Sequence, residues 1–164
     1  MYNVPTYSQF LDTKKNSWKN RSCGIIALKT VMDYLGKSPS INTLIKRGVK
    51  NGAYIKNIGW SHKGLVELAK SYDLKGKNYD WFKKTPEEAW QKTIPYFKKY
   101  PIIASVYKNF NYKNNGHLIV ITGFKNKKVY YNDPIAKRRK EISKKISLKK
   151  FLAGWKRRVI IIKP

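Results

Sequence analysis

The chain has 164 residues, of which 41% are hydrophobic, and it carries 36 Lys and Arg against 9 Asp and Glu, a formal net charge of +27. This apolar content excludes global disorder, and the length suits one domain covering residues 1–164, because domains most often have about 100–150 residues. No apolar run approaches the roughly 20 residues of a membrane-spanning helix, so we expect no transmembrane segment.

The first half of the chain is predicted to be mainly helical. Apolar residues at helical spacing, with Ser or Thr before several segments and Gly after others, indicate four helices. They cover Cys23–Leu35, Ile41–Arg47, a segment from about Ser61 to about Asp73, and a segment from Thr85 to about Thr93. In the first of these, Lys29 and Asp33 mark a solvent-facing stripe. Lys50–Trp60 is expected to be a loop, and Pro95 to break or restart the fourth helix.

The second half is predicted to be mostly β-structure. Runs of β-branched and aromatic residues indicate four strands, at Ile102–Tyr107, Leu118–Thr122, Val129–Tyr131 and Val159–Ile162. A turn at Lys125-Asn126-Lys127 makes the middle two a hairpin, and Ser147 caps a short helix that ends at Gly154. Helices first and strands second predict an α+β fold in which a helical lobe faces an antiparallel sheet lobe.

Three residues of catalytic type lie at the ends of these elements. Cys23, the only cysteine, begins the buried helix, where the helix dipole and free N–H groups favour a thiolate. His117 opens one strand of the hairpin and Asp133 follows the other, so we expect the carboxylate within reach of the imidazole. Each also has an ordinary structural interpretation, as a buried thiol, a surface histidine and a turn residue. Their joint occurrence favours catalysis.

A likeness to a known family runs over nearly the whole chain. It is carried by Val4-Pro5 with Tyr7 and Gln9, Trp18 before Cys23-Gly24, Gly59-Trp60-Ser61-His62 before Leu65 and Ala69, the blocks GHLIVITGF and VYYNDP, and Phe151 with Trp155. With these residues the chain resembles the peptidase C39-like cysteine peptidases of the papain superfamily. The resemblance implies a papain-like fold with Cys23 as nucleophile, His117 as general base, Asp133 as the residue that orients the base, and Gln9 as oxyanion donor.

Two departures from the family pattern limit what the resemblance implies. Ile25 stands where many members have proline soon after the Cys-Gly pair, which alters the helix start but removes no catalytic group. The members known for cleaving double-glycine leader peptides are fused to membrane transporters, whereas this chain has no membrane segment. We therefore do not carry that substrate over.

These observations predict a cysteine peptidase that hydrolyses peptide or isopeptide bonds in a peptide or protein substrate through an acyl-enzyme. The same site would also serve transpeptidation or glutamine deamidation. No cofactor is implied, and with His62 and His117 as the only histidines we expect no metal site. The alternative is a catalytically silent module of the same fold that uses a basic face to hold nucleic acid or another polyanion.

Basic residues concentrate in the C-terminal third of the chain. They form the clusters Lys137-Arg138-Arg139-Lys140, Lys144-Lys145, Lys149-Lys150 and Lys156-Arg157-Arg158. Such a surface predicts an anionic partner, either an acidic substrate, an envelope polymer or nucleic acid, although a solvated face shaped by Lys-rich composition explains it equally. The start at Met1 lacks a secretory signal, so we expect a soluble protein, cytoplasmic if Met1 is the native start and secreted if a leader was trimmed.

Overall fold

The computed structural model describes residues 1–164. Its helices are α1 (Asn16–Lys19), α2 (Cys23–Tyr34), α3 (Ile41–Lys50), α4 (His62–Lys70), α5 (Pro86–Phe97) and α6 (Leu148–Gly154), with single 3-10 turns η1 (Lys108–Phe110) and η2 (Arg139–Glu141). Its strands are β1 (Tyr54–Ile55), β2 (Gly59–Trp60), β3 (Lys75–Asp80), β4 (Ile102–Tyr107), β5 (Gly116–Lys125), β6 (Lys128–Asn132), β7 (Ser143–Ser147) and β8 (Trp155–Lys163). The predicted α+β class is confirmed. No helix has both the length and the apolar character required to cross a bilayer.

Six strands form one antiparallel sheet in the order β3-β8-β4-β5-β6-β7. The β5–β6 hairpin closes through a two-residue turn, Asn126 and Lys127, because Lys125 pairs with Lys128. Both turn residues have positive φ angles, 52° and 56°, the geometry that matches the twist of paired strands. The hairpin brings the start of β5 and the residue after β6 to the same end of the sheet.

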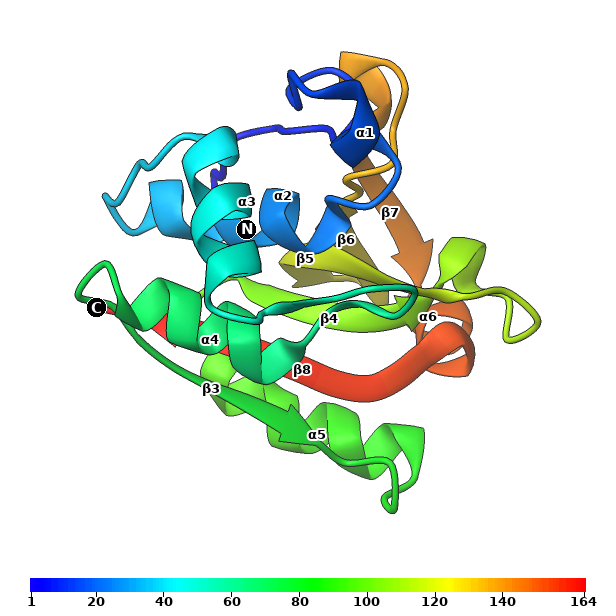
Figure 1. Cartoon of the computed structure of the whole chain (residues 1–164). Coiled ribbons are helices and arrows are strands. Elements are labelled where there is room, and N and C mark those ends of the chain that lie inside the picture. Colours follow the sequence, from blue (N-terminus) through cyan, green and yellow to red (C-terminus); the bar gives the residue numbers. More distant parts are fainter.

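Helices cover both faces of the sheet (Figure 1). On one face α2, α3 and α4 build a core cluster with Leu118, Val120 and other sheet residues, and on the opposite face α5 and α6 pack against Ile119 and Ile121. Alternate residues of β5 thus pack into the two cores, because successive side chains of a strand point to opposite faces of the sheet. Every residue of α2 from 24 to 32 is buried, and α2 packs directly on β5.

Caps expected from the sequence are present. The side chains of Ser40, Ser61 and Ser147 each accept a hydrogen bond from a backbone N–H of the first turn that follows. Thr85 and Glu88 form a reciprocal capping box at the start of α5. These contacts satisfy N–H groups that have no partner within the helix.

Several boundaries differ from the sequence-based expectations. The helix expected over Ile41–Arg47 continues to Lys50. Gly48 lies inside it and allows close packing, since a Cβ there would fall 2.6 Å from Trp60. Pro95 lies inside α5, which continues to Phe97. A proline that close to the C-terminal end removes one helical hydrogen bond without ending the helix.

Four strands lie outside the expected set. The stretch predicted as a loop contains the short β1–β2 hairpin, while β3 and β7 are the two edge strands of the large sheet. Both edge strands are rich in polar and exposed residues, so they lack the apolar runs that mark central strands. The predicted solvent-facing stripe on α2 is also wrong: Lys29 is 6% exposed and bonds Asp33 at 2.6 Å and Ser38 at 2.9 Å.

Candidate active site

The three residues of catalytic type come together at one end of the sheet. Cys23 is the first residue of α2, His117 is the second residue of β5, and Asp133 directly follows β6. Since α2 packs on β5 and β5 pairs with β6, three segments that are far apart in the chain meet here. His117 and Asp133 are buried, and Cys23 is half-buried.

The imidazole of His117 bonds the carboxylate of Asp133, with Nε2 2.8 Å from Oδ1. The same carboxylate has two further partners: Lys144 Nζ lies 2.8 Å from Oδ2, and the backbone N–H of Ile135 donates to Oδ1 at 3.2 Å. Lys144 is on β7, opposite Tyr131 of β6. The carboxylate is therefore fixed in position from three directions.

The electrostatics of this group favour a thiolate–imidazolium pair. Burial raises the pKa of the Cys23 thiol, but hydrogen bonding to His117, the His117 charge and backbone contacts from Leu118 and Gly24 outweigh it, so the net pKa is lowered. Burial lowers the pKa of His117, yet hydrogen bonds and opposite charges from Asp133 and Cys23 raise it to about 9. Because Nε2 is committed to Asp133, Nδ1 is the ring nitrogen left to face the thiol.

Asp133 is the anion that holds this arrangement. Burial raises the pKa of its carboxyl, but His117 and then Lys144, each through a hydrogen bond and its charge, lower the pKa to about 2. The carboxylate therefore stays ionised throughout the neutral range. An ionised, fixed carboxylate orients an imidazole and stabilises its protonated form.

Gln9, the expected oxyanion donor, is 3% exposed, and its Oε1 atom is buried without a hydrogen-bond partner. Its backbone N–H donates to the carbonyl of Pro134 at 2.8 Å, immediately after Asp133. Buried polar groups normally have partners, so this oxygen is an exception within the protein. The structure thus places Gln9 against the Asp133 loop with a free amide oxygen.

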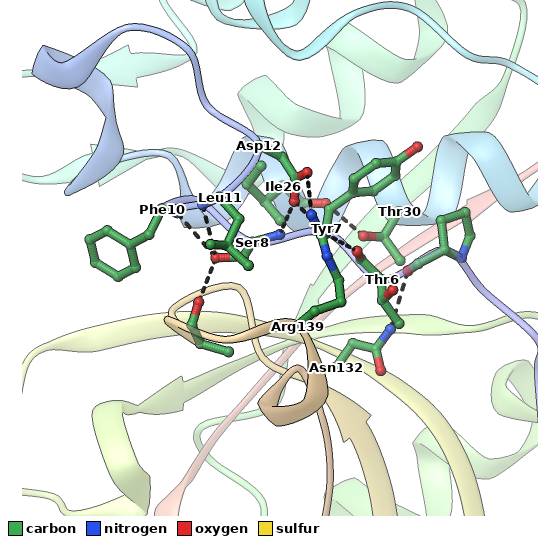
Figure 2. Close-up of polar contacts among 12 residues, drawn as sticks. Thr6, Tyr7, Ser8, Phe10, Leu11, Asp12, Ile26, Thr30, Asn132 and Arg139 are labelled. Atoms are coloured by element: carbon green, nitrogen blue, oxygen red, sulfur yellow. Dashed lines mark hydrogen bonds and ion pairs between the residues drawn. The ribbon is translucent and has the colours of Figure 1, made fainter.

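A polar network holds the segment that carries Gln9 (Figure 2). Arg139 reaches across to Asp12 with two bonds of 2.8 and 2.9 Å, and it also donates to the carbonyl of Thr6 at 2.6 Å. Ser8 donates from its backbone N–H to Asp12 and from its hydroxyl to the carbonyl of Ala136. These contacts bind the segment on both sides of Gln9 to the loop that follows Asp133.

The same segment is also tied to the nucleophile helix. The hydroxyl of Thr13 lies 3.1 Å from that of Ser22, the residue just before Cys23. Next to Cys23, Gly24 packs against Trp60, and a Cβ at this glycine would lie 2.8 Å from Trp60 Cβ. The segment around Gln9 is therefore anchored to the elements that carry both Cys23 and Asp133.

Sequence reasoning missed Lys144, because it lies within a run of basic residues and no pattern indicates which lysine finds a carboxylate. His62, the other histidine, is the first residue of α4, and it is not a partner of Cys23, His117 or Asp133. No group of three or more His, Cys, Asp and Glu side chains is placed to bind a metal ion.

A comparison with protein-family models identifies the family of the chain. The model described as the Peptidase_C39 like family matches residues 1–159. The chain belongs to this family. A comparison with curated protein sequences gave no match.

Solved structures of C39 peptidase domains have the same fold. A C39-like peptidase from Bacillus anthracis is 20% identical with a TM-score of 0.72, covering 100% of this chain and 96% of that one. The peptidase domain of Streptococcus ComA, a bifunctional ABC transporter of a quorum-sensing pathway, is 20% identical (TM-score 0.68; 100% and 99% covered). A double-glycine-motif protease from an AMS/PCAT transporter, in complex with its leader peptide, is 23% identical (TM-score 0.67; 99% and 93% covered). These likenesses confirm the papain-like α+β fold.

Proposed function

We propose that the protein is a cysteine peptidase that cleaves peptide or isopeptide bonds with Cys23 as nucleophile, His117 as acid–base group, Asp133 as orienting anion and Gln9 as oxyanion donor. The observation that carries the proposal is the buried His117–Asp133 pair at 2.8 Å beside a cysteine whose thiol pKa is lowered. Membership of the family and a similar protease bound to a leader peptide support a peptide as the substrate class.

The proposed reaction begins with the thiolate–imidazolium pair. The Cys23 sulfur forms a bond to the carbonyl carbon of the substrate, and the Gln9 amide with the Cys23 backbone N–H holds the resulting oxyanion. For this role the Gln9 side-chain amide donates from Nε2. His117 then transfers its proton from Nδ1 to the leaving amine as the C–N bond breaks. Water, deprotonated by His117, hydrolyses the acyl-enzyme and restores the thiolate.

The test needs no known substrate, because alkylation of Cys23 by iodoacetamide reports its thiolate. In the wild type we expect rapid alkylation well below the ordinary thiol pKa of about 8.5, because the imidazolium stabilises the thiolate. The pair is expected to persist until His117 loses its proton near pH 9. His117→Ala should lose the fast reaction at low pH, while His62→Ala, which removes the other histidine, should retain it.

Two outcomes would contradict the proposal. Slow alkylation that titrates like an ordinary thiol in the wild type would mean that Cys23 is not activated. Where activation is found, a peptide library gives the second check: Cys23→Ala should abolish cleavage and leave the fold intact. Undiminished cleavage by Cys23→Ala would assign the activity to another residue.

A further inference from the structure

Lys156 lies across the end of β5, against Gly116, the residue that precedes the proposed base His117. Its Nζ is 3.1 Å from where a Cβ on Gly116 would be, and 5.3 Å from the ring centroid of Tyr107, the residue paired with Gly116. Strand alternation puts Gly116 on the same sheet face as Leu118, which packs with α2. Lys156 therefore occupies the face of the sheet on which Cys23 begins its helix.

A bulge in β8 gives Lys156 this position. Val106 of β4 pairs with Trp155 and the preceding Ser105 pairs with Arg158, so Lys156 and Arg157 are extra residues on β8. Arg157 has a positive φ of 56°, a strained conformation for a side chain of its size. Bulges re-aim side chains and are common beside active sites. Here the bulge directs Lys156 over the end of the β4–β5 pair.

The ammonium of Lys156 has no counter-ion. It takes part in none of the ion pairs of the structure, whereas its neighbour Arg158 pairs with Asp80 at 2.8 Å. Burial and then the charge of Arg158 lower the pKa of Lys156. Burial and then the charges of Arg158 and Lys156 lower the pKa of His62 as well. Because Asp80 is already paired with Arg158, Lys156 is left as an unpaired cation that an added anion would stabilise.

We propose that Lys156 forms a subsite for the carboxylate of an acidic residue in the peptide substrate. This inference rests on the proposed peptidase function. Leu118, whose backbone contacts the Cys23 thiol, is two residues from Gly116, a distance of about 7 Å along a strand. An extended peptide advances about 3.3–3.6 Å per residue, so the acidic residue is expected within about three residues of the scissile bond.

Epoxysuccinyl peptides provide the test, because they alkylate a cysteine and carry amino-acid chains on both sides of the reactive carbon. Reagents with an alanine background would carry either Glu or its neutral isostere Gln at one position at a time. The measured quantity is the Glu-to-Gln ratio of second-order rate constants for Cys23. At one position within three residues of the epoxide, we expect a ratio of about ten, since a charge-assisted hydrogen bond contributes at least that factor.

Variants locate the effect. Lys156→Gln should bring the ratio to about one, and Lys163→Gln, which removes an exposed lysine from the far end of the same strand, should leave the ratio unchanged. A ratio measured within one variant is not affected by differences in the amount of folded protein. Circular dichroism would verify that Lys156→Gln retains its fold.

The outcomes separate this inference from the proposed function. Equal rates for Glu and Gln at all positions, with Cys23 still reactive, would overturn the subsite and leave the peptidase proposal standing. A preference for Glu that persists in Lys156→Gln would also overturn it, because another cation would then be responsible. Failure of every reagent to modify native Cys23 would contradict the peptidase proposal itself.

Discussion

Two lysines lie near the candidate triad, and they differ in whether an acidic side chain pairs with them. Lys144, on β7, donates to the Asp133 carboxylate at 2.8 Å, whereas Lys156, on β8, has no acidic partner. Both are partly exposed cations from the same basic C-terminal third of the chain. The two lysines therefore differ in what they can do: Lys144 holds the Asp133 carboxylate, and Lys156 has the free charge on which the proposed subsite depends.

The largest effect on peptide turnover is expected from Asp133, the carboxylate that both His117 and Lys144 bond. Asp133→Asn retains a hydrogen-bonding side chain but removes the charge that supports protonated His117 and Lys144. We expect peptide turnover to fall by about 10²–10⁴-fold without being abolished, with a lowered His117 pKa measurable by NMR. Asp73→Asn is the matched control, since the Asp73 side chain is 93% exposed and far less dependent on its lysine. Unchanged turnover in Asp133→Asn would remove Asp133 from the proposed triad.

Lys144→Gln should have an intermediate effect, on stability. The loss of a charge-assisted bond to a buried carboxylate, reduced by the partial exposure of Lys144, should lower the free energy of unfolding by about 1–2 kcal/mol. The Asp133 pKa is about 2 in the folded protein and 3.8 ordinarily, so its contribution is present above the ordinary value and is lost as pH falls toward 2. Urea unfolding should therefore show a gap between wild type and variant at pH 6 that closes near pH 2. A gap that is independent of pH would mean that Lys144 acts without Asp133.

Lys156→Gln should change stability least. With no ion pair to lose, and with a half-buried cation removed from beside Arg158, we expect the free energy of unfolding to stay within about 0.5 kcal/mol of the wild type. The same urea experiment measures it. A loss as large as that of Lys144→Gln would mean that Lys156 has a structural role, and the contrast between the two lysines would disappear.

The sequence predicts most of the secondary-structure elements that carry the candidate site residues. A buried helix beginning at Cys23 and a hairpin between His117 and Asp133 are both expected from local patterns, and the structure brings the latter two to 2.8 Å. Their catalytic roles stay predictions. Gln9 has no local signal at all, since a glutamine in an irregular segment is ordinary, and only the family resemblance indicates its role.

What local patterns miss depends on contacts between distant segments. Nothing near Lys144 or Lys156 indicates that one meets a carboxylate and the other does not, because β7 and the β8 bulge acquire their neighbours only in the assembled sheet. The same holds for Lys29, which as part of a charged pair on a helix predicts a wet stripe but is buried against Asp33 and Ser38. The edge strands are not predicted because they are mostly polar and contain no apolar run.

The bond between Arg139 and Asp12 joins residues 127 positions apart in the chain, so it cannot form until both have been synthesised. A ribosome that has released the chain only as far as α5 has supplied Cys23, but not His117, Asp133 or Arg139. The segment around Gln9 can make its contact with Ser22 early, but its bonds to Ala136 and Arg139 must wait until those residues have emerged. The proposed site therefore stays incomplete until the segments that carry His117, Asp133 and Arg139 have left the ribosome.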